Sequence, residues 1–282
     1  MDLYADAARL LTLPTGGRGY WRLLQLWPAH GIRLYKKDRV VLVYDASDAY
    51  WARLRSNRYE YEPEVANFLR RLSPLKFRFV DAGANIGFWT GWVQVNFEDT
   101  PILAIEPNPL LVKILRANNE LNGGYARCIQ AALSTTAAPS VDFFVPSAPG
   151  GHASASLTSI PNTRPFSVEA RGLDELLLSW NVDREFTVIK LDVEGEEYRL
   201  LRHLANQEAS DQILIYEEHG HDLESRATSA ALSLPEHAIF FLDHKSPPRR
   251  IRTINDVAKL KKSQSRGYNC VAIPERLVDL IR

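Results

Sequence analysis

The chain contains few cysteines and no excess of either charge, and each shortage excludes a class of protein. Its 282 residues include two cysteines, Cys128 and Cys270. Two cysteines cannot form a disulfide framework, and without a C-x-x-C or Cys/His cluster they do not predict a zinc site. Lysine and arginine together number 34, as do aspartate and glutamate, so net charge does not point to nucleic acid as a partner. We interpret the cysteines as free thiols in a reducing compartment.

Long apolar runs are also missing. No stretch approaches the ~18 consecutive apolar residues that a membrane-spanning helix requires. The N-terminal residues lack the basic region, apolar run and small-residue cleavage site that are typical of an export signal. These absences predict a cytoplasmic protein without a transmembrane segment.

The most informative motif lies at residues 79–87 and reads F-V-D-A-G-A-N-I-G. A hydrophobic strand runs into a turn that contains Gly83 and Gly87, and a helix follows. Glycine at these positions lets the backbone approach a ligand and lets the helix pack closely on the strand. Glu106 ends a second apolar run, at the place where an acidic residue binds the two hydroxyls of a ribose. The spacing D-x-G-x-x-x-G, in place of G-x-G-x-x-G, favours a nucleoside ligand that has no pyrophosphate.

Apolar runs alternate with helical patterns from residue 77 onward. The runs cover residues 77–80, 102–105, 186–191 and 213–216, and helical spacing covers 88–96 and 109–122. Short apolar strands that alternate with helices predict an α/β fold with a mainly parallel sheet.

The flanking segments show weaker patterns. Before residue 77 we expect a strand over 39–44 and a helix over 64–72, started by Pro63. Residues 1–27 are apolar and aromatic without a clean period, which is compatible with a helical extension, a partner surface or a membrane-surface helix, and we expect them to pack on the main domain. Residues 147–164 are rich in Ser, Ala, Gly and Pro, which predicts a mobile loop.

A second motif, I-K-L-D-V-E-G-E-E at residues 189–197, follows the third apolar run. Together with the glycine turn and Glu106-Pro107, in this order, it closely resembles the FkbM family of S-adenosylmethionine-dependent methyltransferases. Y-E-P-E at 61–64 and G-Y-N at 267–269 are similar to that family as well. The resemblance implies a Rossmann-like class I methyltransferase fold with a doubly wound, mainly parallel seven-stranded sheet. It implies a methyltransferase domain over residues 61–282, with residues 1–60 as an N-terminal extension that packs on it.

The resemblance also implies an activity. The expected reaction transfers a methyl group from S-adenosylmethionine to a hydroxyl of a sugar, glycolipid or secondary metabolite. A catalytically inactive binding or scaffold protein with the same fold is the alternative, and the intact motifs argue against it. The missing G-x-G-x-x-G disfavours a nicotinamide-dependent oxidoreductase, and neutral charge without an N/D-P-P-Y motif disfavours a nucleic-acid methyltransferase. The expected partner is a small-molecule or glycan acceptor, and a homodimer is compatible with the sequence.

The residues expected to bind the cofactor come from both motifs. Asp81 is expected to order the glycine turn and to face the methionine amino group, with a turn-capping role as the alternative. Gln130 stands where many methyltransferases carry an acidic residue, and its side-chain amide is expected to meet the adenine amino group. Asn85 is expected to contact the cofactor, and the alternative is that it only helps to form the turn. The full expected set is Asp81, Gly83, Asn85, Gly87, Glu106, Gln130 and Asp192.

The expected catalytic residues follow two later strands. Ligands bind outside the carboxyl ends of strands in open α/β sheets, and Asp192, Glu194 and His219 lie at such ends. An alcohol is a poor nucleophile until its proton is accepted, and histidine titrates near neutral pH, so His219 is the expected base. Asp192 is the alternative base or an orienting partner, and Glu194 completes the catalytic set.

A second chemistry stays open at the same place. A divalent cation such as Mg²⁺, held by Asp192 with Glu217 or Glu218, would lower the pKa of the acceptor hydroxyl. Glu196 and Glu197 are interpreted as an acidic pair that faces a helix N-terminus. Residues 245–266 hold eight basic residues and one acidic residue, which would attract a phosphorylated or lipid-linked acceptor or form a solvated surface.

Overall fold

The structure is a computed structural model that describes residues 32–45, 48, 50–56, 58–135, 138–144, 165–193, 195–207 and 211–281. The expectations for residues 1–27 and 147–164, and the role expected of Glu194, fall outside the described residues. Contacts divide the chain into two units. The first comprises Met1–Glu60, Gly83–Ala132 and Pro139–Ala170, and the second comprises Tyr61–Ala82, Leu133–Ala138 and Arg171–Arg282.

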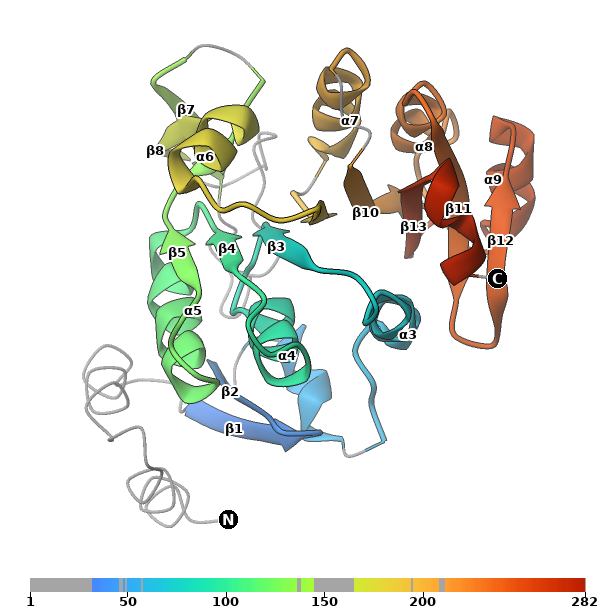
Figure 1. Ribbon diagram of the computed structural model, residues 1–282. Helices are drawn as coiled ribbons and strands as arrows, with labels where there is room; N and C mark the ends of the chain where they lie inside the picture. Colours follow the sequence, from blue (N-terminus) through green and yellow to red (C-terminus); the bar gives the residue numbers. More distant parts are fainter. Residues whose placement is uncertain are drawn as a thin grey trace. The chain divides into compact units, whose positions relative to one another are not determined.

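In its described part, the first unit combines an antiparallel hairpin, a parallel strand pair, a second antiparallel pair and the helices α4 and α5 (Figure 1). Strands β1 and β2 form the hairpin, β4 pairs with β5 in parallel, and β7 pairs with β8 antiparallel. The elements are β1 (Ile32–Lys37), β2 (Val40–Asp45), η1 (Trp51–Arg55), α4 (Phe88–Asn96), β4 (Ile102–Ile105), α5 (Pro109–Leu121), β5 (Arg127–Ile129), β7 (Ser140–Phe144) and β8 (Pro165–Arg171), with β6 (Ala132–Leu133) at the boundary of the units in sequence.

Buried amides on α5 attach the hairpin to the helices of the first unit. The backbone N–H groups of Val41 and Val43 donate to the side-chain oxygens of Asn122 (2.9 Å) and Asn118 (2.7 Å). The Asn118 amide also donates to the carbonyls of Val43 and Ile86. These bonds satisfy backbone groups of β2, which lies beside α4 and α5 (Figure 1).

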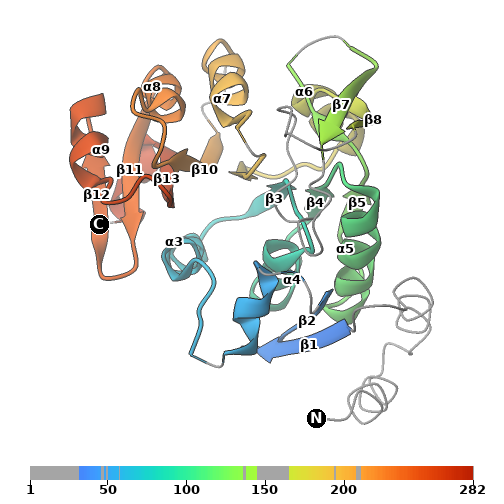
Figure 2. The same ribbon diagram turned by 180° about the vertical axis from the view of Figure 1, so that it is seen from behind.

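The second unit contains a six-stranded sheet with the order β12-β11-β13-β10-β9-β3. Strands β3, β9 and β10 are parallel, and β13, β11 and β12 continue the sheet antiparallel. Helices α7 and α8 of this unit lie side by side (Figure 2). The elements are α3 (Pro63–Arg71), β3 (Phe77–Ala82), α6 (Leu173–Trp180), β9 (Phe186–Leu191), α7 (Glu197–Ala205), β10 (Gln212–His219), α8 (Arg226–Ala231), β11 (His237–Asp243), β12 (Ser246–Ile251), α9 (Ile254–Leu260), β13 (Gly267–Pro274) and η3 (Glu275–Leu280).

The expected α/β class and Rossmann-like fold are confirmed. Strands β3, β4 and β9 coincide with the first three predicted apolar runs, and every residue of β9 is buried, as in parallel strands covered on both faces. Within the second unit, β3, β9, β10, β13 and β11 form the expected mainly parallel part and its antiparallel continuation, and β12 adds a further strand on β11. Within the described residues, no helix is long and apolar enough to cross a membrane.

One strand is longer than its apolar run predicts. β10 continues beyond Tyr216 to His219, because its ladder with β13 extends over these three residues. Glu217, Glu218 and His219 therefore lie on a strand and not on the loop that follows it. Neighbouring residues on a strand face opposite sides of the sheet, which decides which of them can act together.

Candidate active site

The glycine turn of the first unit has three residues in the left-handed region: Gly83 (φ 79°), Asn85 (φ 52°) and Gly87 (φ 84°). The N–H groups of Gly83 and Ala84 both donate to the carbonyl of Ile105 at 2.9 Å, which fixes the turn to the end of β4. Asn85 tolerates this backbone conformation better than most residues. Its side-chain oxygen accepts from the backbone N–H of Ile86 and from Trp51 Nε1. The turn-forming role of Asn85 is therefore observed, and Trp51 is an additional partner.

Gly87 is required by packing within the protein. A Cβ at this position would lie 2.6 Å from Leu115 Cδ1, and the positive φ would strain any other residue. The sequence suggests two reasons for a glycine here, close approach of a ligand and close packing of a helix. The contact with Leu115 corresponds to the second. Helix α4 begins directly after Gly87, and Leu115 lies on α5.

Glu106 is 4% exposed and organises the same turn. One carboxylate oxygen accepts from the N–H of Asn85 and the other from the N–H of Asn108, each at 2.9 Å. A carboxylate accepts about four hydrogen bonds, so these two do not prevent it from binding a ribose diol as well. A turn of left-handed residues beside a buried carboxylate fits a nucleoside. Gln130 follows β5 with an exposed side chain.

The second unit holds a cluster of charged residues around one buried lysine. Lys190 is 2% exposed, and its Nζ lies 2.7 Å from Asp192 Oδ2 and 3.6 Å from Glu62 Oε2. Asp81 is the register partner of Lys190 in the β3–β9 ladder. Burial alone would lower the pKa of Lys190, but attraction to Asp192 and Glu62 outweighs it and raises the pKa above its ordinary value. Lys190 is therefore a permanent cation among carboxylates.

Glu217 belongs to the same unit and has a shifted titration. Burial, reinforced by the charge of Asp192, raises the pKa of Glu217 to about 7, against the opposing effect of His219. Gly267 makes room for this side chain, since a Cβ on Gly267 would lie 1.1 Å from Glu217 Oε1. In the sequence, the G-Y-N motif at 267–269 has no role beyond its resemblance to the family. The structure gives Gly267 one, which is to leave space for the Glu217 side chain.

His219 lies between two carboxylates. Its Nε2 is 3.6 Å from Glu197 Oε2 and its Nδ1 is 3.8 Å from Glu217 Oε2. Glu217 and His219 share a face of β10 because they are two residues apart. The Glu197 carboxylate is buried and also accepts from the N–H groups of Val193 and Gly195, each at 2.9 Å. Glu197 thus begins α7 as predicted, and it also joins the loop after β9 to His219, which the sequence did not indicate.

Glu218 lies on the other face of β10 and corrects one expectation. Its side chain is fully buried, accepts from Thr228 N and Oγ1, and pairs with Lys261. It cannot join Asp192 and Glu217 around a cation, because adjacent strand residues point in opposite directions. Among the described residues, no group of three or more His, Cys, Asp or Glu is arranged to hold a metal ion.

The raised pKa of Glu217 predicts a pH-dependent stability difference. With a pKa of about 7 when folded and 4.5 ordinarily, Glu217 takes up protons on folding between these values. Its contribution to stability therefore falls as the pH rises through this window. We expect Glu217→Gln, relative to wild type, to gain roughly 1–3 kcal/mol between pH 4 and pH 8 in urea unfolding. The exposed Glu224→Gln is the control, and identical pH profiles for all three proteins would contradict the shifted pKa.

The comparisons with known proteins agree with the sequence motifs. A family model described as the methyltransferase FkbM domain matches residues 81–246. A comparison with curated proteins found no match. The matched stretch contains the glycine turn, Glu106, Lys190, Asp192 and His219.

Solved structures show similarity at low identity. A precorrin-6y C5,15-methyltransferase from Geobacter metallireducens is 11% identical, covering 78% of this chain and 91% of that chain with a TM-score of 0.43. A putative O-methyltransferase from Klebsiella pneumoniae is 12% identical, covering 96% of both chains with a TM-score of 0.42. The tRNA (uracil-54, C5)-methyltransferase of Pyrococcus abyssi, solved with S-adenosyl-L-homocysteine, is 12% identical, covering 86% of this chain and 43% of that chain with a TM-score of 0.43. Similarity at this level carries no information about the substrate.

Proposed function

The chain belongs to the FkbM methyltransferase family, and on that premise we propose that it is an O-methyltransferase. The methyl donor is S-adenosylmethionine, and the acceptor is a hydroxyl of a sugar, glycolipid or secondary metabolite. The observation that supports oxygen as the acceptor atom is His219, held at the end of β10 between Glu197 and Glu217. Hydroxyl methylation needs a group that accepts a proton, and a histidine beside two carboxylates can do so. We further expect the protein to act in the cytoplasm.

The first unit offers the residues that fit the methyl donor. S-adenosylmethionine, when bound, supplies a methyl group activated by a positively charged sulfur. Glu106 is assigned to the two ribose hydroxyls, because a buried carboxylate at a strand end can accept both. The turn over Gly83 and Asn85 is assigned to the backbone approach of the nucleoside, and Gln130 to the adenine amino group.

The second unit offers the residues that prepare the acceptor. Glu197 is fixed by two backbone N–H groups with its Oε2 3.6 Å from His219 Nε2, and the negative charge there favours the tautomer with the proton on Nε2. That tautomer makes Nδ1 the basic atom, and Nδ1 accepts the hydroxyl proton as the acceptor oxygen attacks the methyl group. The imidazolium that results is stabilised by both carboxylates. Asp192 is engaged by Lys190 at 2.7 Å, which makes it an orienting group in preference to the base.

Calorimetry of the purified protein tests the proposal. We expect titration with S-adenosylmethionine and S-adenosylhomocysteine to show binding, with and without magnesium or EDTA. Labelled cofactor should then transfer its methyl group to a hydroxylated acceptor from a screened panel. The absence of cofactor binding in every condition would instead favour a scaffold protein with a methyltransferase fold.

Glu106→Ala should weaken cofactor binding by ~1.5–3 kcal/mol, or about 10- to 150-fold in Kd, the cost of losing charged hydrogen bonds. Glu106→Gln retains the size of the side chain and separates loss of charge from loss of the turn contacts. Glu120→Ala, at an exposed position of α5, is the control. Wild-type affinity in both Glu106 variants would show that ribose is bound elsewhere.

A further inference from the structure

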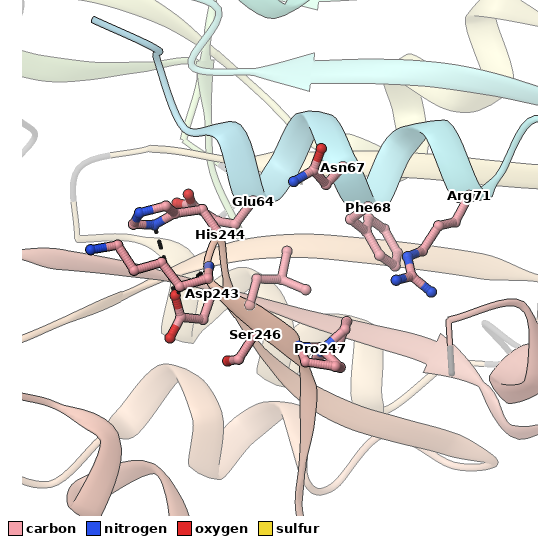
Figure 3. Close-up of a pocket in the computed structure, with 11 residues that line it drawn as sticks. Glu64, Asn67, Phe68, Arg71, Asp243, His244, Ser246 and Pro247 are labelled. Atoms are coloured by element: carbon pink, nitrogen blue, oxygen red, sulfur yellow. Dashed lines mark hydrogen bonds and ion pairs between the residues drawn. The ribbon is translucent and has the colours of Figure 1, made fainter.

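A cavity of about 430 Å³ lies in the second unit between one face of α3 and the segment that joins β11 to β12 (Figure 3). Its volume falls within the ~300–1,000 Å³ range of small-molecule sites. Helix α3 contributes Glu64, Asn67, Phe68 and Arg71, whose spacing of three and four residues places them on one helix face. Glu64 and His244 lie at one end of the cavity and Arg71 at the other (Figure 3).

The charges that line the cavity cancel. Glu64 and Asp243 face it as acids, and Arg71 and Lys245 as bases. A site for phosphate or carboxylate would have an excess of arginine or lysine. Hydrogen bonding to the backbone N–H of Lys245 lowers the pKa of Asp243, so this acid is ionised at neutral pH. The balance favours an uncharged ligand with many hydrogen-bonding groups.

Three of the eight basic residues at 245–266 have acidic partners or neighbours. Lys261 is committed to the buried carboxylate of Glu218, and Arg250 pairs with Glu275. Lys245 lines the cavity together with Asp243. Of the two interpretations of residues 245–266, attraction of a phosphorylated acceptor thus receives no support from these three basic residues.

Apolar side chains complete the lining. Phe68 and Leu242 are buried, and Pro247 and Pro248 come from the start of β12. A pyranose ring presents C–H groups on its faces and hydroxyls around its edge. A lining of rings and aliphatic groups with acids, bases and amides around them matches that pattern, since each polar group can donate to or accept from a hydroxyl.

The cavity is connected to the proposed acid–base residues through Glu64. Its Oε1 accepts from Asn269 Nδ2 at 2.9 Å, and Asn269 is the register partner of Glu217 in the β10–β13 ladder. Glu62, two residues before Glu64, lies 3.6 Å from Lys190. The Glu64 end of the cavity therefore adjoins the residues assigned to the acceptor.

We propose that this cavity binds a sugar ring of an uncharged glycan acceptor. The role of the bound sugar as a methyl acceptor rests on the proposed function, whereas the binding of a sugar in the cavity does not. The ring lies against Pro247, which is exposed at the start of β12, and its hydroxyls bond to the acids and bases along α3 and the β11–β12 segment.

Saturation-transfer NMR on the full chain tests the site without requiring turnover. The probes are the methyl glycosides of glucose, galactose, mannose and rhamnose, with glucose 6-phosphate for comparison. Asn67→Trp, at an exposed position on the cavity face of α3, should fill the cavity and weaken glycoside binding at least about fivefold. Arg116→Trp, exposed on α5 and outside the lining, should bind as wild type does.

Three results would overturn the site. These are no glycoside signal with wild type, equal weakening in the two tryptophan variants, and preferential binding of glucose 6-phosphate that Lys245→Glu removes. Calorimetric titration of the same samples with S-adenosylmethionine keeps the two proposals apart. Cofactor binding without a glycoside effect of Asn67→Trp would contradict the cavity alone. Glycoside binding that Asn67→Trp removes, in a protein that transfers no methyl group, would contradict the proposed function alone.

Discussion

His219→Ala is expected to lower the turnover number by about 10²- to 10⁴-fold, the usual contribution of a general base. Cofactor affinity should remain nearly unchanged, because the residues assigned to S-adenosylmethionine in the first unit make no use of the imidazole. The reduction arises because the acceptor hydroxyl loses the group that takes its proton as it attacks. Steady-state kinetics with labelled cofactor, together with calorimetry, measures both effects.

His221→Ala provides the matched control for this experiment. The two rings are stacked with centroids 5.3 Å apart, but the side chain of His221 is exposed, whereas that of His219 lies between Glu197 and Glu217. Its removal should change turnover little. Unchanged turnover in His219→Ala would remove this residue from the mechanism and transfer the role of base to Asp192 or Glu217.

The fold follows from local patterns to a large extent. The apolar runs that became β4 and β9 are buried along their whole length, and β3 is buried at every residue except Arg78, so apolar residues mark all three strands in the sequence. The hairpin of β1 and β2 is harder to predict, because buried asparagines of α5 satisfy part of its backbone. Such contacts join residues about 80 positions apart, as Val41 and Asn122 are, and no local period reveals them.

The sequence predicts the candidate site less completely than the fold, because several of its residues lie inside strands and contact segments that are distant in sequence. His219 and Asp192 can be predicted as site residues because they come after apolar runs. The sequence pattern gives no comparable signal for a charged residue inside an apolar run. Lys190 lies within a buried strand, where its charge is balanced by Asp192, two residues later, and by Glu62 from a distant part of the sequence. A sequence prediction that continued β10 through His219 would have placed Glu217 and Glu218 on opposite faces of the sheet, because neighbouring strand residues alternate between the two faces. Gly267 becomes meaningful only once Glu217 is seen to occupy the space of its missing side chain.

Lys190→Met is expected to destabilise the fold by ~3–5 kcal/mol, the cost of removing one partner from a buried ion pair. The substitution leaves Asp192 and Glu62 as buried or half-buried carboxylates without their cation. Lys37→Met is the matched control, because Lys37 pairs with a largely exposed Glu60 and such surface pairs contribute about 0–1 kcal/mol. Urea unfolding at neutral pH measures both differences.

Two further measurements identify the cause of the loss. Adding Asp192→Asn to Lys190→Met removes one uncompensated charge, so the double variant should be more stable than the single one. Lowering the pH should reduce the cost of Lys190→Met, since carboxylates that lack a cation bind protons more readily in the folded state than when unfolded. If Lys190→Met costs no more than Lys37→Met, Lys190 does not hold these carboxylates together. If the cost is large but independent of pH and of Asp192→Asn, the loss of stability comes from packing. In that case the charge of Lys190 does not position Asp192 for the acceptor.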